Sequence, residues 1–335
     1  PLTSSNVVIT GASSPANIQV DKAPREFGDS MYSVEFADTF MPNETRRYEI
    51  RHGVGVSRKP QPIRGHVLTE TDDSYIITNK PYLTWKIPKN LDGLISSMNF
   101  PPSEHISPGG KGIFLLDQTD KQIFIAGNTI KSEVIRRGPL VVQLRFRQTL
   151  KKDLSVIVDL NFPVSRSWVE VQVRVHDPEN QISGIANAVM LNLDKPEHKT
   201  PTIADFGGGT SGYVTLLADQ TSRLTASNSK WSISKISSPN PVKIFASTES
   251  KAEGWAHIMD RERCLAMAVT DFGVATEDSI ELTGAGHVLA TRVFPDDVKT
   301  KILRTWYHFV FYPPQVSAAT GPQAMQNPLR ISVRQ

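Results

Sequence analysis

Arg304, Trp306 and His308 alternate along the segment Ile302–Phe311, so their side chains point the same way if this segment is a strand. Neighbouring side chains on one face of a strand lie about 7 Å apart. The three groups combine a cation, a flat aromatic surface and an imidazole that titrates near neutral pH. Such a set can hold an anion, stack against a ring and transfer a proton, which makes it the strongest candidate site in the sequence.

Other polar and aromatic side chains could extend this site. Trp255 and His257 form a second aromatic and imidazole pair, which would complete a binding subsite if its strand borders the same groove. Further polar side chains alternate along the segments Val141–Arg147 and Trp168–His176, namely Arg145, Arg147, Glu170, Arg174 and His176. Polar side chains that alternate on a strand most often just face water, so each of these positions also has this plainer interpretation.

The elements that must position these groups are strands. In Trp168–His176 four valines alternate with polar residues, which is the pattern of a strand with one buried face. Similar runs recur along the chain, giving on the order of twenty candidate strands separated by Gly, Pro, Asn and Asp. No segment has the periodicity of an amphipathic helix. We therefore predict an all-β fold, a large antiparallel two-sheet β-sandwich.

The domain organisation follows from the same pattern. No linker long enough to divide the chain stands out, so we predict one domain over residues 1–335, with residues 1–30 and 313–335 partly peripheral. Tyr307 falls on the apolar side of its strand, which is typical of a core residue. Cys264 lies in an apolar run, and we expect it to be buried and inert.

Composition narrows the functional classes. The chain has 335 residues, of which 39% are hydrophobic, enough to build a sizeable core. A formal net charge of +3 is too small to indicate nucleic-acid binding, and no segment is apolar enough to cross a bilayer. The single Cys264 excludes an intrachain disulfide and zinc sites built on several cysteines. No compact cluster of Asp and Glu suggests a metal, so we expect no cofactor, and the sequence leaves the oligomeric state open.

Three stretches resemble the galactose-mutarotase-like β-supersandwich found in polysaccharide lyases. They are Thr78–Lys89, Ser132–Arg147 and Gly254–Tyr312, and they cover roughly half of the chain. The nearest likeness is to the β-sandwich region of exo-rhamnogalacturonan lyase and YetA-like proteins. The chain departs from that family in two ways, because the α/α toroid of many such lyases is absent and Arg137 stands where a Glu is common.

The resemblance implies an acidic polysaccharide or oligosaccharide as ligand and a β-elimination on a uronate as the reaction. Arg304 and Arg174 would then neutralise the carboxylate, His308 or His176 would be the base, and Tyr307 or a second histidine would be the acid. The contacts to the sugar would come from Arg145, Arg147, Glu170, Trp306, Trp255 and His257.

Two other functions stay open at this stage. A mutarotase-like or hydrolytic sugar enzyme needs a histidine paired with a carboxylate, and Glu170 and His176 share a strand face that could supply this pair. A non-catalytic carbohydrate-binding or interaction module would need neither. The chain begins with Pro1 and lacks an apolar leader, so we expect a mature secreted or periplasmic protein or a trimmed one.

Overall fold

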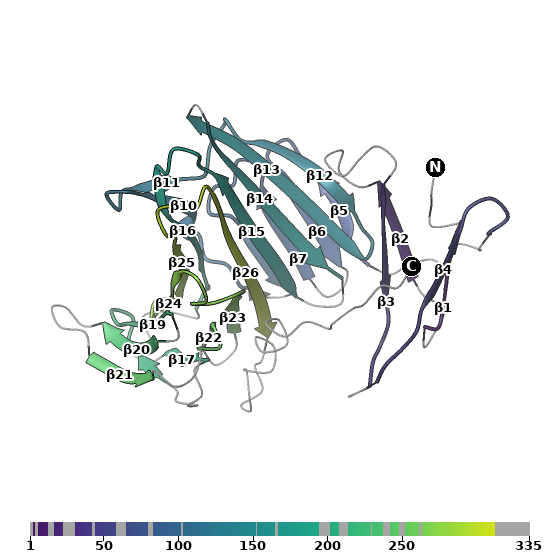
Figure 1. The fold of residues 1–335 in the computed structure, drawn as a ribbon. Helices are drawn as coiled ribbons and strands as arrows, with labels where there is room; N and C mark the ends of the chain where they lie inside the picture. The colour runs from purple at the N-terminus through teal and green to yellow at the C-terminus, as the bar shows by residue number, and fades with distance from the viewer. Residues whose placement is uncertain are drawn as a thin grey trace.

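The computed structural model contains strands throughout its described part. Among these residues there are 26 strands and no helix (Figure 1), which confirms the all-β prediction. No helix among them is long and apolar enough to span a membrane. The described residues are 3, 6–12, 17–22, 31–41, 44–57, 65–79, 83–101, 103–151, 153–164, 167–193, 202–207, 214–228, 230–236, 242–247, 252–260 and 263–311.

A nine-stranded antiparallel sheet carries the alternating segments found in the sequence. β15 lies inside this sheet between β14 and β26, and its valines Val169, Val171, Val173 and Val175 are fully buried, as the period of two predicts. β26 pairs with β15 on one side and β23 on the other. The strand order is β12 (Lys131–Arg137), β13 (Val141–Lys151), β14 (Leu154–Pro163), β15 (Trp168–His176), β26 (Thr300–Phe311), β23 (Arg263–Val269), β22 (Trp255–Met259), β17 (Thr202–Phe206) and β18 (Val214–Leu216).

The opposite layer consists of two sheets rather than the single sheet predicted. Both are antiparallel. Along the chain, the Pro108–Gly110 turn separates β9, the last strand of the five-stranded sheet, from β10, the first strand of the eight-stranded sheet. Proline cannot donate a ladder hydrogen bond, so such a turn interrupts the pairing. One sheet comprises β5 (Val67–Glu70), β6 (Ser74–Asn79), β7 (Leu83–Pro88), β8 (Ser97–Phe100) and β9 (Ser103–Glu104); the other has the order β11 (Gln122–Phe124), β10 (Gly112–Asp117), β16 (Ile182–Met190), β25 (His287–Val293), β24 (Glu277–Thr283), β19 (Thr221–Ser227), β20 (Lys230–Ile236) and β21 (Val242–Ser247).

The core lies between these layers. Trp85 of β7 packs edge to face against Phe162 and Phe309 of the nine-stranded sheet, with ring centroids 5.3 and 5.4 Å away. On the side of the eight-stranded sheet, the buried Asn187 Nδ2 donates a hydrogen bond of 2.8 Å to Thr305 Oγ1 of β26. One continuous apolar cluster therefore covers the inner face of the nine-stranded sheet and leaves its other face, the outer face, for polar groups.

The N-terminal strands form two separate two-stranded sheets, one of β1 (Val7–Thr10) with β4 (Glu49–His52) and one of β2 (Asn17–Lys22) with β3 (Tyr32–Ala37). They share a small apolar cluster of their own, distinct from the main core, and lie at one side of the molecule in Figure 1. The buried Gln19 ties them to the nine-stranded sheet, because its Oε1 accepts hydrogen bonds from the amides of Leu140 and Val141. Residues 313–335 lie outside the described part of the chain.

Candidate functional site

The outer face of the nine-stranded sheet gathers the strongest sequence candidates into two adjacent rows. In the first row, β-pairing aligns Asp205, His257, Ala266, His308 and Trp168 across five strands. The second row runs parallel to it and consists of Trp255, Ala268, Trp306, Glu170 and Asn161. The sequence predicted that Trp255 and His257 would join the β26 trio if their strands bordered one groove. The two strands are separated by β23 alone, whose outward residues in these rows are alanines.

Three tryptophans form an aromatic cluster on this face. Trp168, Trp255 and Trp306 pack around Ala268 as an apolar cluster separate from the core. The Trp168 ring meets Trp306 edge to face at 6.2 Å and His308 at 5.5 Å between centroids. Trp306 and His308 are partly exposed, whereas Trp255 is only 4% exposed and its Nε1 donates to Glu253 Oε2 at 2.6 Å. Trp306, Trp168 and His308 are therefore the members of this region that a ligand could reach.

Arg304 and Glu170 form an ion pair beside this aromatic cluster. The Arg304 Nε donates to Glu170 Oε1, and the guanidinium carbon lies 5.5 Å from the centre of the Trp306 ring. Asn161 Nδ2 donates a second hydrogen bond of 3.3 Å to the same carboxylate. The Arg304 side chain is 44% exposed, whereas the Glu170 side chain is 10% exposed. Arg304 thus holds the carboxylate in place while part of its guanidinium stays open to solvent.

Of the other arginines predicted to contact the ligand, two form ion pairs with carboxylates and one does not. Arg145 makes a buried two-pronged contact with Asp159, at 2.6 Å from Nε and 3.0 Å from Nη2. Arg147 donates to Glu133 at 3.2 Å. For Arg174, by contrast, the described part of the chain supplies no hydrogen bond or ion pair. Carboxylates of the same sheet therefore balance the charges of Arg145 and Arg147, whereas Arg174 has no counter-ion among the described residues.

The structure does not bring two of the predicted catalytic residues to the site. His176 is exposed at the far end of β15, eight residues from Trp168 and so roughly 26 Å from it along the strand. Tyr307 is fully buried between the layers, as its apolar phase predicts, and its hydroxyl donates to the carbonyl of Asn187 at 3.4 Å. Burial also raises the pKa of Tyr307 far above its ordinary value. Assigning Tyr307 as the acid is therefore wrong, because its hydroxyl faces the core.

His257 and Asp205 are buried members of the first row. Burial, with a smaller contribution from the charge of His308, lowers the pKa of His257 to about 4, so its imidazole is neutral at pH 7. Its Nε2 contacts the Cys264 thiol, and burial raises the pKa of that thiol, which agrees with the inert role predicted for it. Burial raises the pKa of Asp205 against the opposing hydrogen bond from the Phe206 amide. Both groups are candidates for supporting His308 rather than for direct contact with a ligand.

Three site residues were missed by sequence reasoning: Trp168, Asn161 and Asp205. A signal existed for Trp168, because it has the same phase as Glu170 on the alternating strand. Asn161 and Asp205 carry no comparable signal, since only the pairing of β14 and β17 with their neighbours brings them to this face. The described residues contain no group of three or more potential metal ligands of the His, Cys, Asp and Glu types.

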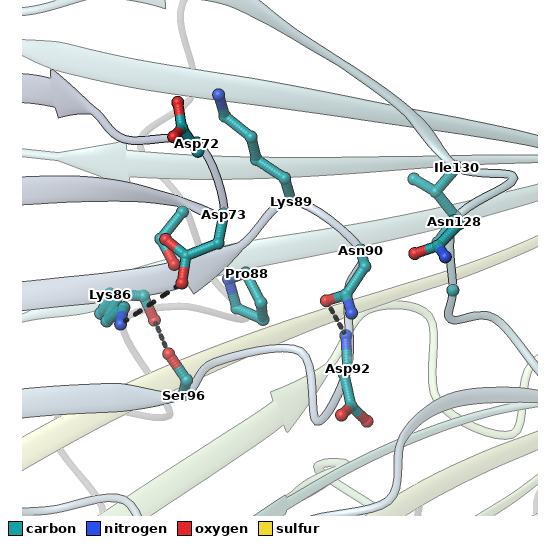
Figure 2. A pocket seen from close by; sticks show the side chains of 12 residues that line it. Asp72, Asp73, Lys86, Pro88, Lys89, Asn90, Asp92, Ser96, Asn128 and Ile130 are labelled. Atoms are coloured by element: carbon teal, nitrogen blue, oxygen red, sulfur yellow. Dashed lines mark hydrogen bonds and ion pairs between the residues drawn. The ribbon is translucent and has the colours of Figure 1, made fainter.

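An open cavity of about 600 Å³ lies elsewhere, between the β5–β6 turn, the β7–β8 loop and the β11–β12 loop. Figure 2 shows its polar lining, in which Lys86 Nζ lies 4.0 Å from Asp73 and Asn90 Oδ1 accepts from the Asp92 amide at 3.2 Å. It contains none of the predicted site residues. Its charged groups are of both signs, and no buried unpaired group among its described lining points to a ligand.

The core position of Tyr307 gives a direct test. Tyr307→Phe removes one long hydrogen bond and leaves the ring packing intact, so we expect a loss of unfolding free energy of at most about 1.5 kcal/mol. Sugar binding and turnover should stay unchanged, since the hydroxyl does not reach the outer face. Chemical denaturation and activity measured on the same preparation check both expectations. A large loss of activity in a stably folded variant would restore Tyr307 as a candidate acid.

Comparison with known proteins supports the fold. No protein-family model matches the chain, and no characterised relative matches it in sequence. A glycosyl hydrolase family 38 protein from Enterococcus faecalis is similar in structure, with a TM-score of 0.53 and 8% identity over 93% of this chain and 39% of that one. Two further solved structures are more distant in TM-score.

The first of these is the α-N-acetylgalactosaminidase NagBb from Bifidobacterium bifidum, with a TM-score of 0.44 and 10% identity over 74% of this chain and 36% of that one. The second is the GalM/aldose epimerase homologue from C. elegans, with a TM-score of 0.38 and 11% identity over 74% and 99%. The chain thus spans about a third of the length of NagBb. At these identities the similarity concerns the fold alone: the chain is an antiparallel all-β sandwich.

Proposed function

We propose that the chain binds a sugar on the outer face and catalyses mutarotase-like proton transfer at its anomeric centre. The observation that carries this proposal is the joint placement of the Trp168–Trp306 platform, the partly exposed His308 and the Glu170–Arg304 ion pair. The platform offers an apolar surface to the C–H face of a pyranose ring, and the polar groups at its edge can address the hydroxyls.

The reaction requires two groups that handle protons on opposite sides of the sugar. Because Trp168 pairs with His308 and Glu170 pairs with Trp306, Glu170 and His308 are diagonal neighbours, with Cα atoms about 7–8 Å apart. One group would take the proton from the anomeric hydroxyl while the other gives a proton to the ring oxygen, so that the C1–O5 bond breaks and an open-chain aldehyde forms. Reclosure on the other face of the aldehyde then gives the other anomer and returns both protons.

The test is the rate at which a freshly dissolved pure anomer of a free sugar changes its optical rotation. We expect the protein to accelerate this change for at least one member of a panel of aldohexoses, pentoses and uronic acids, above a buffer blank and a heat-denatured control. Binding of a sugar without acceleration would replace the enzymatic proposal with a non-catalytic binding module. Absence of both would remove the sugar-related function.

β-Elimination on a uronate-containing glycan is a second candidate function. It is favoured by Arg304, which keeps partial exposure and lies on the same strand face as His308, four residues away. This cation would neutralise a uronate carboxylate as the C5 proton leaves. Incubation with acidic polysaccharides should then raise the ultraviolet absorbance of unsaturated uronate, and a flat absorbance across the panel would exclude this reaction for the glycans used.

Trp306 provides the sharpest test of the binding surface. Trp306→Ala removes one of the two rings of the platform and is expected to weaken sugar binding by about 2 kcal/mol or more, roughly thirtyfold. Phe124→Ala is a matched control, because Phe124 is also an exposed aromatic residue but lies in β11 of the other layer. Calorimetric titration with the best ligand of the panel measures both variants. If Trp306→Ala and the wild type had equal affinities for the sugar, the proposed binding surface on the outer face would be wrong.

A further inference from the structure

Arg174 is a partly buried cation without a counter-ion among the described residues. On the outer face its cross-strand neighbours are Ile157 of β14 and Ile302 of β26, so that apolar side chains flank it on both sides. Arg174 itself is of intermediate exposure, and Ile302 is 38% exposed. A guanidinium has five N–H donors and no acceptor, so neither isoleucine can satisfy it.

The other arginines of this face in the described strands all have carboxylate partners. Arg136 is paired with Glu35, Arg145 with Asp159, Arg147 with Glu133 and Arg304 with Glu170. Asp159 is the acid diagonal to Arg174 in the register, and Arg145 already binds both of its oxygens. Asp177, three residues along the chain, is fully buried against Lys301 instead. Among the described residues of this face, four arginines are therefore neutralised and Arg174 is left without a counter-ion.

We propose that Arg174 binds an anionic substituent of an oligosaccharide, either a carboxylate or a sulfate ester, while another ring of the same ligand occupies the Trp306 platform. This inference rests on the proposed function, which it deepens by defining the class of ligand. A planar guanidinium can donate two parallel hydrogen bonds to such an anion, and its apolar neighbours limit the competition from water.

The length of the ligand follows from the strand geometry. Arg174 is four residues from Glu170 along β15, a separation of about 13 Å. A single pyranose ring cannot span this distance, whereas a short linear oligosaccharide can lie along the strand from one end to the other. Gln172, between Glu170 and Arg174 on the same face, is partly exposed and lies under the path of such a ligand.

The experiment compares three probes on the wild type and on Arg174→Gln by calorimetric titration. The probes are a galacturonate trisaccharide, the neutral trisaccharide maltotriose and the monosaccharide galacturonic acid, and a sulfated trisaccharide is added to distinguish the two anions. We expect the substitution to weaken binding of an acidic trisaccharide roughly ten- to hundredfold. Binding of maltotriose and of galacturonic acid should change less than twofold, because neither reaches Arg174 with a charge. Arg136→Gln is the matched control and should leave binding of all probes unchanged, since Arg136 is an arginine of the same face whose charge Glu35 already balances.

The outcomes separate this inference from the proposed function. If the wild type binds sugars at Trp306 but Arg174→Gln binds the acidic and neutral trisaccharides as the wild type does, the Arg174 subsite is wrong and the proposed function stands. If none of the probes binds the wild type, both are overturned. An affinity for the acidic trisaccharide that falls with added salt in the wild type, but not in Arg174→Gln, would support the subsite independently of the size of the affinity change.

Discussion

Replacing His308 with Ala is expected to lower the rate of anomer interconversion by about 10²- to 10⁴-fold, the contribution typical of one positioned acid or base. His308 is the only imidazole of the described outer-face rows that combines partial exposure with contact to the aromatic cluster, because His257 is fully buried. The affinity for the sugar should change much less than the rate, since Trp168 and Trp306 retain the stacking surface. Polarimetric rates together with calorimetric affinities measure the two effects separately.

His176→Ala is the matched control for this experiment. His176 is an exposed histidine of the same sheet face, at the far end of β15 from His308. The His176→Ala substitution should therefore leave the rate of anomer interconversion and the affinity for the sugar unchanged. If His176→Ala abolished turnover while His308→Ala retained full activity, the catalytic centre would lie at the other end of the strand, and the role proposed for His308 would be wrong.

Much of the fold could be predicted because a period of two determines which side chains share a face. The valines of Trp168–His176 are buried as the alternation predicts, and so are Val142, Leu144 and Phe146 of β13 and Leu303, Tyr307 and Phe309 of β26. Alternation does not determine which strands become neighbours. β15 pairs with β26 although 123 residues separate the end of one strand from the start of the other, from His176 to Thr300, and no local signal encodes that pairing.

The same limit explains the errors in the predicted site. From one strand alone, Glu170 could be paired only with His176, the histidine on its own face. The register of β15 with β26 instead puts Glu170 beside Trp306 and diagonal to His308. Likewise, neither Asp205 nor the alanines of β23 could be assigned to the site before the order of β26, β23, β22 and β17 was known. The types of the reactive groups were thus readable from the sequence, whereas their combinations depended on strand pairing.

Lys301 and Asp177 form the pair from which we expect the largest effect on stability. Both side chains are fully buried, and Lys301 Nζ donates to Asp177 Oδ2 at 2.9 Å, Asn180 Oδ1 at 3.0 Å and the Val298 carbonyl at 2.7 Å. All three donors of the ammonium are therefore satisfied. The pair joins the end of β15 to the start of β26, the two strands that carry the candidate site.

Lys301→Met should lower the unfolding free energy by about 3–5 kcal/mol at pH 7, because it leaves the Asp177 carboxylate buried without its cation. Lys299→Met is the control, since Lys299 is exposed, and it should change stability by less than about 0.5 kcal/mol. The double variant Asp177→Leu with Lys301→Met should recover part of the loss, because no charge then stays buried. Urea denaturation of the four proteins measures these differences, and a Lys301→Met variant as stable as the wild type would contradict the argument.

The pH dependence of the same variant tests the cause of the loss. Burial tends to raise the pKa of Asp177, but hydrogen bonds from the Gln181 amide, Lys301 and the Ile182 amide outweigh it, and the pKa is lowered below its ordinary 3.8. A carboxyl whose pKa is lowered on folding stabilises the protein above its unfolded value, and this contribution disappears as the pH falls through the folded one. The wild type should therefore lose stability as the pH drops below 3.8. In Lys301→Met the uncompensated charge disappears on protonation, so the stability difference between the two proteins should shrink in acid. A difference that stays constant from pH 7 to acid would assign the loss to packing rather than to charge.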